Sequence, residues 1–351
     1  MVIRRIIIFF IPYHHIGGAE RVHLEIIKAL KHKPIVFFDR TDGSVLSDEF
    51  RKHAYCFFAT NNKRKAYVEK GLKLISYFVP LTLFGCNSLF FYQVIQNIKK
   101  NIKTIDLTHA FSYTDEGIEI LSLPYVHLLD HRVVINTKTL LDYKALYEKQ
   151  GMESHFLKRF SIIPNGIPIG MFNQQDVVSR FHCFTIGFVG RNSVEKRPEL
   201  FFDIVKDLKH QVKVIGNRFE NFKKSHPNVS FLENCNAPKT IQNAFSEISV
   251  LIVSSSREGF PLVIMEAMAL GIPVISTNVG SIHEHLINGI NGFISEDNSE
   301  KGFLNFTQDK ILQLSNNLEL YSKLAHNARV YAESHFALDT FKKEYNTLFY
   351  A

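Results

Sequence analysis

The stretch VLIVSSSREGFPLVIMEAMALGIPVI, residues 250–275, decides the fold class. Val250–Val253 is entirely apolar, as in a strand that is buried on both faces of its sheet. Gly259 and Pro261 mark a turn and the start of a helix, and Gly271-Ile272-Pro273 ends that helix before a second apolar strand. A strand, a helix and a second strand in this order form a βαβ unit, so the sequence predicts a parallel sheet.

The same alternation of short apolar strands and amphipathic helices continues on both sides of this stretch. The predicted strands form one series at Ile6–Ile11, Ile35–Phe38, Tyr55–Phe58, Ile105–Ala110 and Tyr125–Leu129, and a second at Thr185–Val189, Lys213–Ile215, Val229–Leu232, Val250–Val253 and Pro273–Ser276. The Pro- and Gly-containing segment 163–168 joins the two series. We therefore expect an α/β protein with two Rossmann-like domains facing a cleft, residues 1–165 and residues 166–335.

The last helix is expected to belong to the first domain. Ser334-His335-Phe336 interrupts the helical pattern, and Phe341, Tyr345, Leu348 and Phe349 then recur on one helical face. We predict that residues 336–351 cross back and pack on residues 1–165.

Composition excludes several classes of protein. The chain has 351 residues, of which 46% are hydrophobic and 21% charged, and these fractions are those of a globular protein rather than a disordered or fibrous one. Its four cysteines include no CxxC pair, which argues against a disulfide scaffold or a structural zinc site and favours a reducing cytoplasm.

Positive charge is concentrated in the first half of the chain. Residues 1–165 contain 23 Lys and Arg against 15 Asp and Glu, an excess of +8, whereas residues 166–351 contain 18 against 19. This asymmetry indicates an anionic partner for the first domain, or a solvated basic face with no partner. No nucleic-acid-binding motif accompanies it, so we expect no nucleic acid among the partners.

An uncharged stretch, Leu74–Ile98, lies within this basic half. Lysines and an arginine flank it on both sides, at residues 63–65, 70 and 73 and at residues 99, 100 and 103. Polar residues and Pro80 interrupt it, and the alternation of strands and helices predicts buried helices here. A helix lying in a membrane interface and a membrane span remain the alternatives.

Two glutamates eight residues apart, Glu258 and Glu266, are the strongest chemical signal. Glu258 stands in the turn before the predicted helix, and Glu266 lies within that helix. The exposed amides at a helix N-terminus, those of Gly259, Phe260 and Leu262 around Pro261, can hold an anionic or hydroxyl-rich ligand. A capped helix with two solvated glutamates is the alternative interpretation.

The whole string resembles the Glu-x7-Glu motif of retaining glycosyltransferases, and the chain resembles glycosyltransferase family 4, which has the GT-B fold. Three further segments carry the resemblance. Gly17-Gly18-Ala19-Glu20-Arg21 is similar to the family's N-terminal glycine loop, Gly187-Phe188-Val189-Gly190-Arg191 with Glu195-Lys196-Arg197-Pro198 to its donor-diphosphate motif, and Gly289-Ile290-Asn291-Gly292-Phe293 to the turn after its donor site. The match implies a retaining glycosyltransferase that uses a nucleotide-diphosphate sugar.

The resemblance assigns a role to each residue. Arg191 and Lys196 would neutralise the leaving diphosphate, and since no Asp-x-Asp motif is present we expect no metal. Glu258 would hold hydroxyls of the donor sugar and Glu266 those of the ribose, because a carboxylate can accept two hydrogen bonds from a diol. Gly17 and Gly18 would let the backbone approach the donor's phosphate. Attack on the front face, with the departing phosphate as base, requires no enzymic nucleophile.

Histidines of the first domain are the candidates for the acceptor site. The family often has a functional histidine after a central strand, and here His109 precedes the matching position, which Phe111 occupies. His131, beside Asp130, is a second candidate, and His14 and His15 precede the glycine loop. His283-Glu284-His285 does not have the spacing of a helical zinc motif.

The implied function is the transfer of a sugar to a glycan or lipid-linked acceptor in bacterial surface polysaccharide or glycolipid synthesis. The expected location is the cytoplasm, with a peripheral position on the inner membrane as a further expectation. A non-catalytic nucleotide-sugar-binding protein and a nucleotide-sugar epimerase on the same fold remain the alternatives. The donor's base and sugar and the identity of the acceptor stay open.

Overall fold

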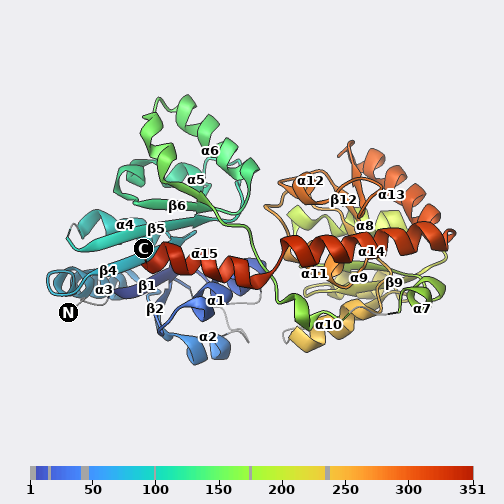
Figure 1. Cartoon of the computed structure of the whole chain (residues 1–351), viewed down its shortest axis with the longest axis horizontal. Coiled ribbons are helices and arrows are strands. Elements are labelled where there is room, and N and C mark those ends of the chain that lie inside the picture. The colour runs from blue at the N-terminus through green and yellow to red at the C-terminus, as the bar shows by residue number, and fades with distance from the viewer. Residues whose placement is uncertain are drawn as a thin grey trace. The chain divides into compact units, whose positions relative to one another are not determined.

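All the strand pairs that the structure describes are parallel, as short apolar strands separated by helices require. The computed structural model describes residues 5–14, 17–40, 47–98, 100–173, 176–233 and 238–350. The strands form one seven-stranded and one six-stranded sheet, each flanked by helices (Figure 1). The chain divides into a first unit, Met1–Asn165 with Asp339–Ala351, and a second unit, Gly166–Leu338. The predicted architecture of two Rossmann-like α/β units is confirmed.

The first unit is built on a sheet with the strand order β3-β2-β1-β4-β5-β6-β7. Its strands are β1 (Ile6–Ile11), β2 (Ile35–Phe38), β3 (Tyr55–Phe58), β4 (Leu81–Cys86), β5 (Ile102–Thr108), β6 (His131–Val134) and β7 (Phe160–Ile162). Its helices are α1 (Gly18–Ala29), α2 (Ser47–His53), α3 (Asn62–Ile75), α4 (Leu89–Asn97), α5 (Ile118–Leu121), α6 (Thr137–Lys149) and α15 (Leu338–Tyr350), with short 3-10 helices η1 (Leu123–Leu128) and η2 (Ser154–Arg159).

The second unit repeats the plan with the strand order β10-β9-β8-β11-β12-β13. Its strands are β8 (Thr185–Val189), β9 (Gln211–Ile215), β10 (Ser230–Leu232), β11 (Val250–Val253), β12 (Val274–Thr277) and β13 (Phe293–Ser295). Its helices are α7 (Val177–His182), α8 (Pro198–Val205), α9 (Glu220–Ser225), α10 (Pro238–Ser246), α11 (Leu262–Ala269), α12 (Ile282–His285), α13 (Glu300–Ser315) and α14 (Leu318–His335), with η3 (Ile169–Met171) and η4 (Val194–Lys196).

The central strands are buried on both faces, and their side chains make the core of each unit. In the first unit Phe10 of β1 packs edge-on against Phe90 of α4, with ring centroids 5.3 Å apart. In the second unit Ile186, Val250 and Ile252 are almost fully buried beneath α8 and α13. This burial explains why these strands are continuous apolar runs.

The prediction for Leu74–Ile98 is wrong in part, because the stretch contains a central strand as well as a helix. Leu74 and Ile75 end α3, β4 follows with all six residues buried between β1 and β5, and α4 comes next. No helix among the described residues is long and apolar enough to cross a membrane.

The predicted strand at Tyr125–Leu129 is also wrong, since this segment forms η1, with Pro124 near its start. Pro124 has no N–H to donate to a sheet, and its fixed φ suits the first turn of a helix. The strand of this region is β6, which begins at His131.

The final helix packs on the first unit as predicted (Figure 1). Phe349 lies against Phe9 of β1 and Phe84 of β4, with both pairs of ring centroids 5.7 Å apart. Lys103 Nζ donates a hydrogen bond to the Leu348 carbonyl at 2.7 Å. The C-terminal helix therefore completes the core of a unit whose other elements come from residues before 166.

Candidate functional site

The carboxyl ends of the adjacent strands β8 and β11 carry the residues predicted to bind a diphosphate and a sugar. β8 ends at Val189, and the chain continues through Arg191 and η4 into α8. β11 ends at Val253 and leads through Glu258 into α11. Because β8 and β11 are hydrogen-bonded neighbours in one parallel sheet, the two loops emerge side by side at the edge where such sheets bind ligands.

Glu258 and Lys196 form an ion pair that joins these two loops. Lys196 Nζ and Ser255 Oγ both donate to Glu258 Oε1, the latter at 2.6 Å. The two charged side chains are mostly buried, with 20% of Lys196 and 11% of Glu258 exposed. The sequence alone did not predict this pairing, and it places a cation and a carboxylate in one partly desolvated site.

Arg191 lies at the outer rim of the same loop. Its guanidinium NH2 is 3.3 Å from Glu195 Oε1, and 54% of the side chain is exposed. Such an exposed pair holds its members weakly, so the guanidinium can turn toward an anion without a large loss of stability. The Arg191 side chain can thus change its position more easily than that of Lys196, although both residues belong to one segment.

Backbone contacts fix the two loops against each other. Ser256 N donates to the Glu195 carbonyl at 2.8 Å, and Ser254 Oγ donates to the Lys196 carbonyl at 2.9 Å. Arg197 has φ 47° and donates from Nε to the Ser254 carbonyl at 2.6 Å. Arg197 therefore ties the two loops together through hydrogen bonds to the backbone carbonyls of Ser254 and Ser255.

Gly280, after β12, supports the Glu258 turn from beneath. Its φ is +59°, and a Cβ at this position would stand 2.2 Å from the Glu258 carbonyl oxygen. Ser281 donates to the Gly259 carbonyl from both N and Oγ, each at 2.9 Å. Ser281 thus supplies a hydrogen-bonding side chain that fixes the turn.

Helix α11 presents its N-terminus at this turn. Pro261 is the N-cap residue, without a side-chain cap, and Leu262 is the first helical residue. The first amides of a helix have no partner within it, so they are available to a ligand. Phe260 is buried against His285 with ring centroids 4.3 Å apart, and burial lowers the pKa of His285, which keeps that ring neutral.

Glu266 lies in α11 and is almost fully buried, with 1% of the residue exposed. A buried carboxylate in the middle of a helix is costly unless it is hydrogen-bonded, which distinguishes Glu266 from a solvated surface glutamate. Its expected contact with a ribose stays a prediction.

The glycine loop of the first unit leads into α1. Gly17 is the N-cap residue with an extended backbone, and its carbonyl accepts from Arg21 N at 3.1 Å. Gly18 is the first residue of the helix. The approach of a phosphate to Gly17 and Gly18 stays a prediction.

His109 and His131 lie at opposite ends of two neighbouring strands of the first sheet. His109 follows the carboxyl end of β5, whereas His131 begins β6, beside Asp130, whose Oδ2 accepts from Thr104 N at 2.7 Å. Ligands of parallel sheets bind at the carboxyl edge. The structure therefore does not bring the two histidines to one site, and the position of His131 does not support an acceptor role.

Two further histidines were candidates for the same region. His14 is buried and packs edge-on against Phe38 and Phe58, at centroid distances of 5.2 and 5.3 Å. His14 is therefore part of the core. His15 lies outside the described residues.

A buried ion pair organises the middle of the first sheet. Arg132 donates to Asp106 Oδ2 at 2.8 Å, to Tyr147 Oη at 2.9 Å and to Ser122 Oγ at 2.9 Å. Burial raises the pKa of Asp106, and Arg132 opposes that rise. Both side chains are engaged within the fold, so the pair is structural.

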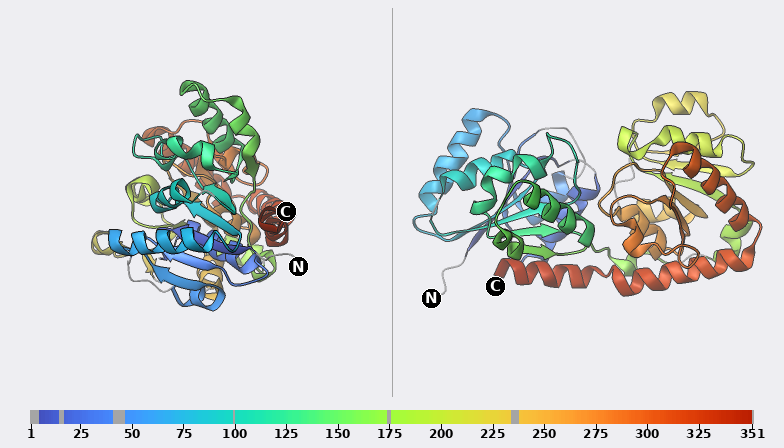
Figure 2. Two further views of the ribbon diagram at one scale, coloured as in Figure 1. Left: turned by 90° about the vertical axis from the view of Figure 1, so that its left-hand side faces the viewer. Right: turned by 90° about the horizontal axis from the view of Figure 1, so that it is seen from above.

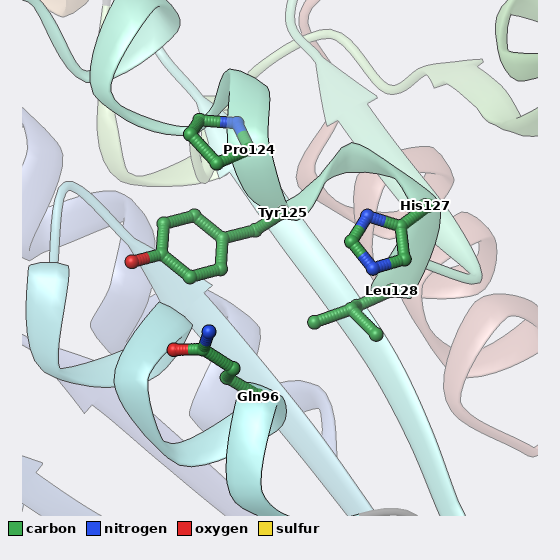
Figure 3. Close-up of a pocket in the computed structure, with 5 residues that line it drawn as sticks. All are labelled: Gln96, Pro124, Tyr125, His127 and Leu128. Atoms are coloured by element: carbon green, nitrogen blue, oxygen red, sulfur yellow. The ribbon is translucent and has the colours of Figure 1, made fainter.

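A pocket of about 260 Å³ lies between α4 and η1 (Figure 3). Gln96 from α4 faces Tyr125 of η1 across it, and Pro124, His127 and Leu128 complete its lining. None of the predicted site residues lines this pocket, and it is smaller than the roughly 300–1,000 Å³ typical of ligand sites.

The chain is similar to known glycosyltransferases. Residues 180–331 match the family model described as glycosyl transferases group 1, a range that contains Arg191, Lys196, Glu258 and Glu266. The chain is 26% identical over 364 residues to an uncharacterized glycosyltransferase of Methanocaldococcus jannaschii, covering 95% of this chain and 94% of the relative. It is 23% identical over 364 residues to the O-antigen biosynthesis glycosyltransferase WbnH of Escherichia coli, covering 97% and 98%.

Solved structures show the same fold over the whole chain. The structure of Anabaena HepE in complex with UDP-glucose superimposes with a TM-score of 0.78 at 17% identity, covering 98% of this chain and 99% of that one. At this identity the likeness concerns the fold, which is GT-B. The family match over the second unit and the relatives that span the whole chain together support a glycosyltransferase with the GT-B fold.

Proposed function

We propose that this protein is a retaining glycosyltransferase of the family 4 type that transfers a hexosyl group from a nucleotide-diphosphate sugar. The acceptor is a glycan or a lipid-linked glycan in bacterial surface polysaccharide or glycolipid synthesis. The observation that carries the proposal is the Lys196–Glu258 pair beside Arg191, at the carboxyl ends of β8 and β11 and before the N-terminus of α11. The UDP-glucose in the HepE structure and the O-antigen role in the name of WbnH support the proposed donor and acceptor classes.

The two cations have different tasks in this mechanism. Glu258 pairs with Lys196 and holds its ammonium group in place. A bound diphosphate would compete for the ammonium group, and the exposed Arg191 would close on it with a planar two-point contact. Charge that grows on the leaving phosphate is then stabilised by groups already positioned for it.

Glu258 is better suited to hold sugar hydroxyls than to attack a sugar carbon. Its Oε1 already accepts from Lys196 and from Ser255 Oγ, and hydrogen bonds of this kind reduce the nucleophilicity of a carboxylate. The acceptor would instead attack on the face from which the diphosphate leaves, with the departing phosphate as base. The anomeric configuration of the donor would be retained.

A panel of nucleotide sugars tests the proposal directly. The correct donor should raise the melting temperature, since binding to the folded state stabilises it by mass action. Incubation with glycan acceptors should then give a product whose anomeric configuration, determined by NMR, is that of the donor. Donor binding without turnover would identify a non-catalytic binding protein, and a changed sugar without transfer would identify an epimerase.

Turnover is expected to be independent of added divalent cations. Arg191 and Lys196 supply the positive charge that a bound metal provides in other enzymes, so EDTA should leave the rate nearly unchanged. The rate of sugar transfer with and without EDTA is the measurement. A loss of about tenfold or more that Mg²⁺ or Mn²⁺ restores would contradict this mechanism.

We further propose that the first unit docks on the cytoplasmic face of the inner membrane, next to a lipid-linked acceptor. Helix α3 lies on the outside of this unit (Figure 2). Exposed basic and apolar side chains share one of its faces.

A further inference from the structure

Three potential metal ligands from separate elements meet inside the first unit. His23 lies in α1, Cys86 is the last residue of β4, and His109 follows β5. One nitrogen from each imidazole and the Cys86 sulfur all lie within 4.8 Å of one another. β4 and β5 are neighbouring strands in which Cys86 pairs with Leu107, two residues before His109, and His23 of α1 lies close to both. No part of this cluster belongs to the proposed diphosphate site.

The contact between the two imidazoles has the dimensions of a metal site. His23 Nε2 and His109 Nε2 are 3.2 Å apart. Two nitrogens bound to one tetrahedral Zn²⁺ at about 2.0–2.1 Å stand about 3.3 Å from each other. The fold therefore places these two nitrogens at nearly the distance that separates two ligand nitrogens of a tetrahedral zinc ion.

Hydrogen bonds among the described residues do not satisfy every polar atom of the cluster. His23 is 2% exposed, and among the described residues its Nδ1 has no hydrogen-bond partner. A direct His23–His109 hydrogen bond leaves that nitrogen unsatisfied in either tautomer, and an unsatisfied buried polar atom costs about 1–3 kcal/mol. Cys86, 1% exposed, adds a thiol to the same buried space.

Charge around the cluster favours a cation. Burial lowers the pKa of His23 well below its usual value and that of His109 to about 4, so both rings are neutral at pH 7 with lone pairs available. Burial, together with the carboxylates Asp106 and Glu20, raises the pKa of Cys86. Asp106 is paired with Arg132, so of the two it is Glu20 that supplies negative potential for a bound cation, and such a cation can displace the thiol proton.

We propose that His23, Cys86 and His109 bind one Zn²⁺ ion, with a water molecule as the fourth ligand. Two imidazoles and a thiolate are ligands that zinc prefers, and three protein ligands with water complete a tetrahedron. Binding forms the zinc–sulfur bond and releases the Cys86 proton to solvent. The ion would fasten α1, which starts at the Gly17–Gly18 loop, to the carboxyl ends of β4 and β5.

This site is compatible with sugar transfer that needs no added divalent cation. The proposed zinc ligands all lie in the first unit, whereas Arg191 and Lys196, the two cations assigned to the diphosphate, lie in the second. Added zinc would restore a property that depends on this buried structural ion. Mg²⁺ or Mn²⁺ would restore a property that depends on an ion bound to the diphosphate.

The test is metal binding by the full chain. We expect about one Zn²⁺ per chain by mass spectrometry of metals after dialysis against zinc, and a rise in melting temperature relative to the metal-free protein. With Co²⁺ in place of Zn²⁺, a near-ultraviolet thiolate-to-cobalt absorption band should appear. Failure of the wild-type chain to bind zinc stoichiometrically, or a cobalt complex without the thiolate band, would overturn the proposal.

Substitutions identify the ligands. Cys86→Ser should abolish the thiolate band, and His23→Gln should weaken zinc affinity by more than the roughly 10–100-fold typical of residues that only support a ligand. The matched control is Cys56→Ser, which removes a half-buried thiol from β3 of the same unit and should leave both readouts unchanged. Unaltered binding in both Cys86→Ser and His23→Gln would refute the assignment. The wild-type cobalt spectrum decides the matter if either variant fails to fold.

Discussion

Arg191 and Lys196 are both proposed to stabilise the leaving diphosphate, but their surroundings in the fold differ. Replacing either residue should therefore lower turnover to a similar extent, whereas the effects on stability should differ. Arg191→Ala and Lys196→Ala should each lose about 2–4 kcal/mol of transition-state stabilisation, or about 30–1,000-fold in kcat/KM. Lys196→Ala should also lower the melting temperature, because it leaves the mostly buried Glu258 without its cation, whereas Arg191→Ala should not.

Sugar-transfer kinetics and thermal melting of the two variants measure these effects. Lys206→Ala is the control, since Lys206 is an exposed lysine of the same unit that pairs only with Asp203 at 3.7 Å. Near-normal turnover of both variants on the correct donor would show that the diphosphate lies elsewhere.

The sequence predicted the charged residues of the site but not the contacts that fix them. Arg191, Lys196 and Glu258 stand in motifs that resemble those of a known family, and the resemblance implies a role for each of them. Ser255 lies in a run of three serines, and only the folded turn shows which of them reaches Glu258. No short motif in the sequence marks the His23–Cys86–His109 cluster, because three separate elements supply its residues.

The turn that holds Glu258 provides a matched pair of glycine substitutions. Gly280 and Gly289 have similar backbone angles, φ +59° and +74°, so an alanine carries a comparable strain of about 1–3 kcal/mol at either position. Only at Gly280 would the new Cβ meet backbone, 2.2 Å from the Glu258 carbonyl oxygen. A Cβ at Gly289 would have no heavy atom of the described residues within 4 Å, apart from its own chain neighbours.

Gly280→Ala should therefore weaken binding of the donor nucleotide by at least about tenfold, and Gly289→Ala should destabilise the protein without this loss. Calorimetric titration with the nucleotide diphosphate and thermal melting separate the two effects. Equal affinities of the two variants would mean that the Glu258 turn does not contact the donor.

At the scale of elements, the alternation of strands and helices was enough to predict both sheets. Errors occurred where a buried strand and a buried helix have the same composition. β4 was interpreted as helix because an apolar run without charges has no period that distinguishes the two. β13 was not predicted from the sequence, and its three residues directly follow Gly292 of the turn segment 289–293. The helical face that contains Phe341, Tyr345 and Phe349, by contrast, has a clear period.

The packing of α15 predicts a strong dependence of the first unit on the end of the chain. Phe349 is 1% exposed and contacts Phe9 and Phe84 of two central strands. Phe349→Ala should cost about 3–5 kcal/mol of unfolding free energy, as large-to-small substitutions in a core do. The exposed Lys343 of the same helix provides the control, Lys343→Ala, which should change stability by less than about 0.5 kcal/mol.

Urea denaturation monitored by hydrogen exchange in each unit measures the loss of unfolding free energy, which is expected in the first unit. A loss confined to residues 166–338, or no loss, would contradict the assignment of α15 to the first core.

At the scale of the whole molecule, the excess of +8 in residues 1–165 is not explained by the proposed diphosphate site, whose cations lie in the second unit. Helix α3 suggests an explanation. Lys63, Tyr67, Lys70 and Leu74 follow each other at helical spacing and are all exposed, with 65% of Tyr67 and 63% of Leu74 accessible. Leu72, on the other side of the helix, is buried in the core.

The turn after α3 extends this surface. Tyr77 and Phe78 are 54% and 73% exposed, and Lys100 Nζ lies 5.5 Å from the centroid of the Tyr77 ring. Apolar side chains that a protein leaves exposed next to basic ones are suited to the boundary between lipid headgroups and acyl chains. An anionic bilayer offers about 1 kcal/mol for each basic residue near its surface, and that attraction fades within a Debye length of about 8–10 Å.

We therefore predict salt-sensitive binding of the full chain to anionic vesicles through the exposed face of α3. The triple variant Lys63→Glu, Arg64→Glu, Lys70→Glu should lose this binding and keep donor affinity. Lys65 is excluded because its Nζ lies 5.3 Å from the centroid of the Phe90 ring, so reversal there would disturb packing as well as charge. The matched control reverses Lys206, Lys209 and Lys224, three exposed lysines of the second unit, which changes the net charge equally. Flotation with vesicles at low and high salt measures the binding. If both triple variants lose it equally, net charge alone holds the protein on the bilayer, and if the wild-type chain never binds, the basic half is only a solvated surface.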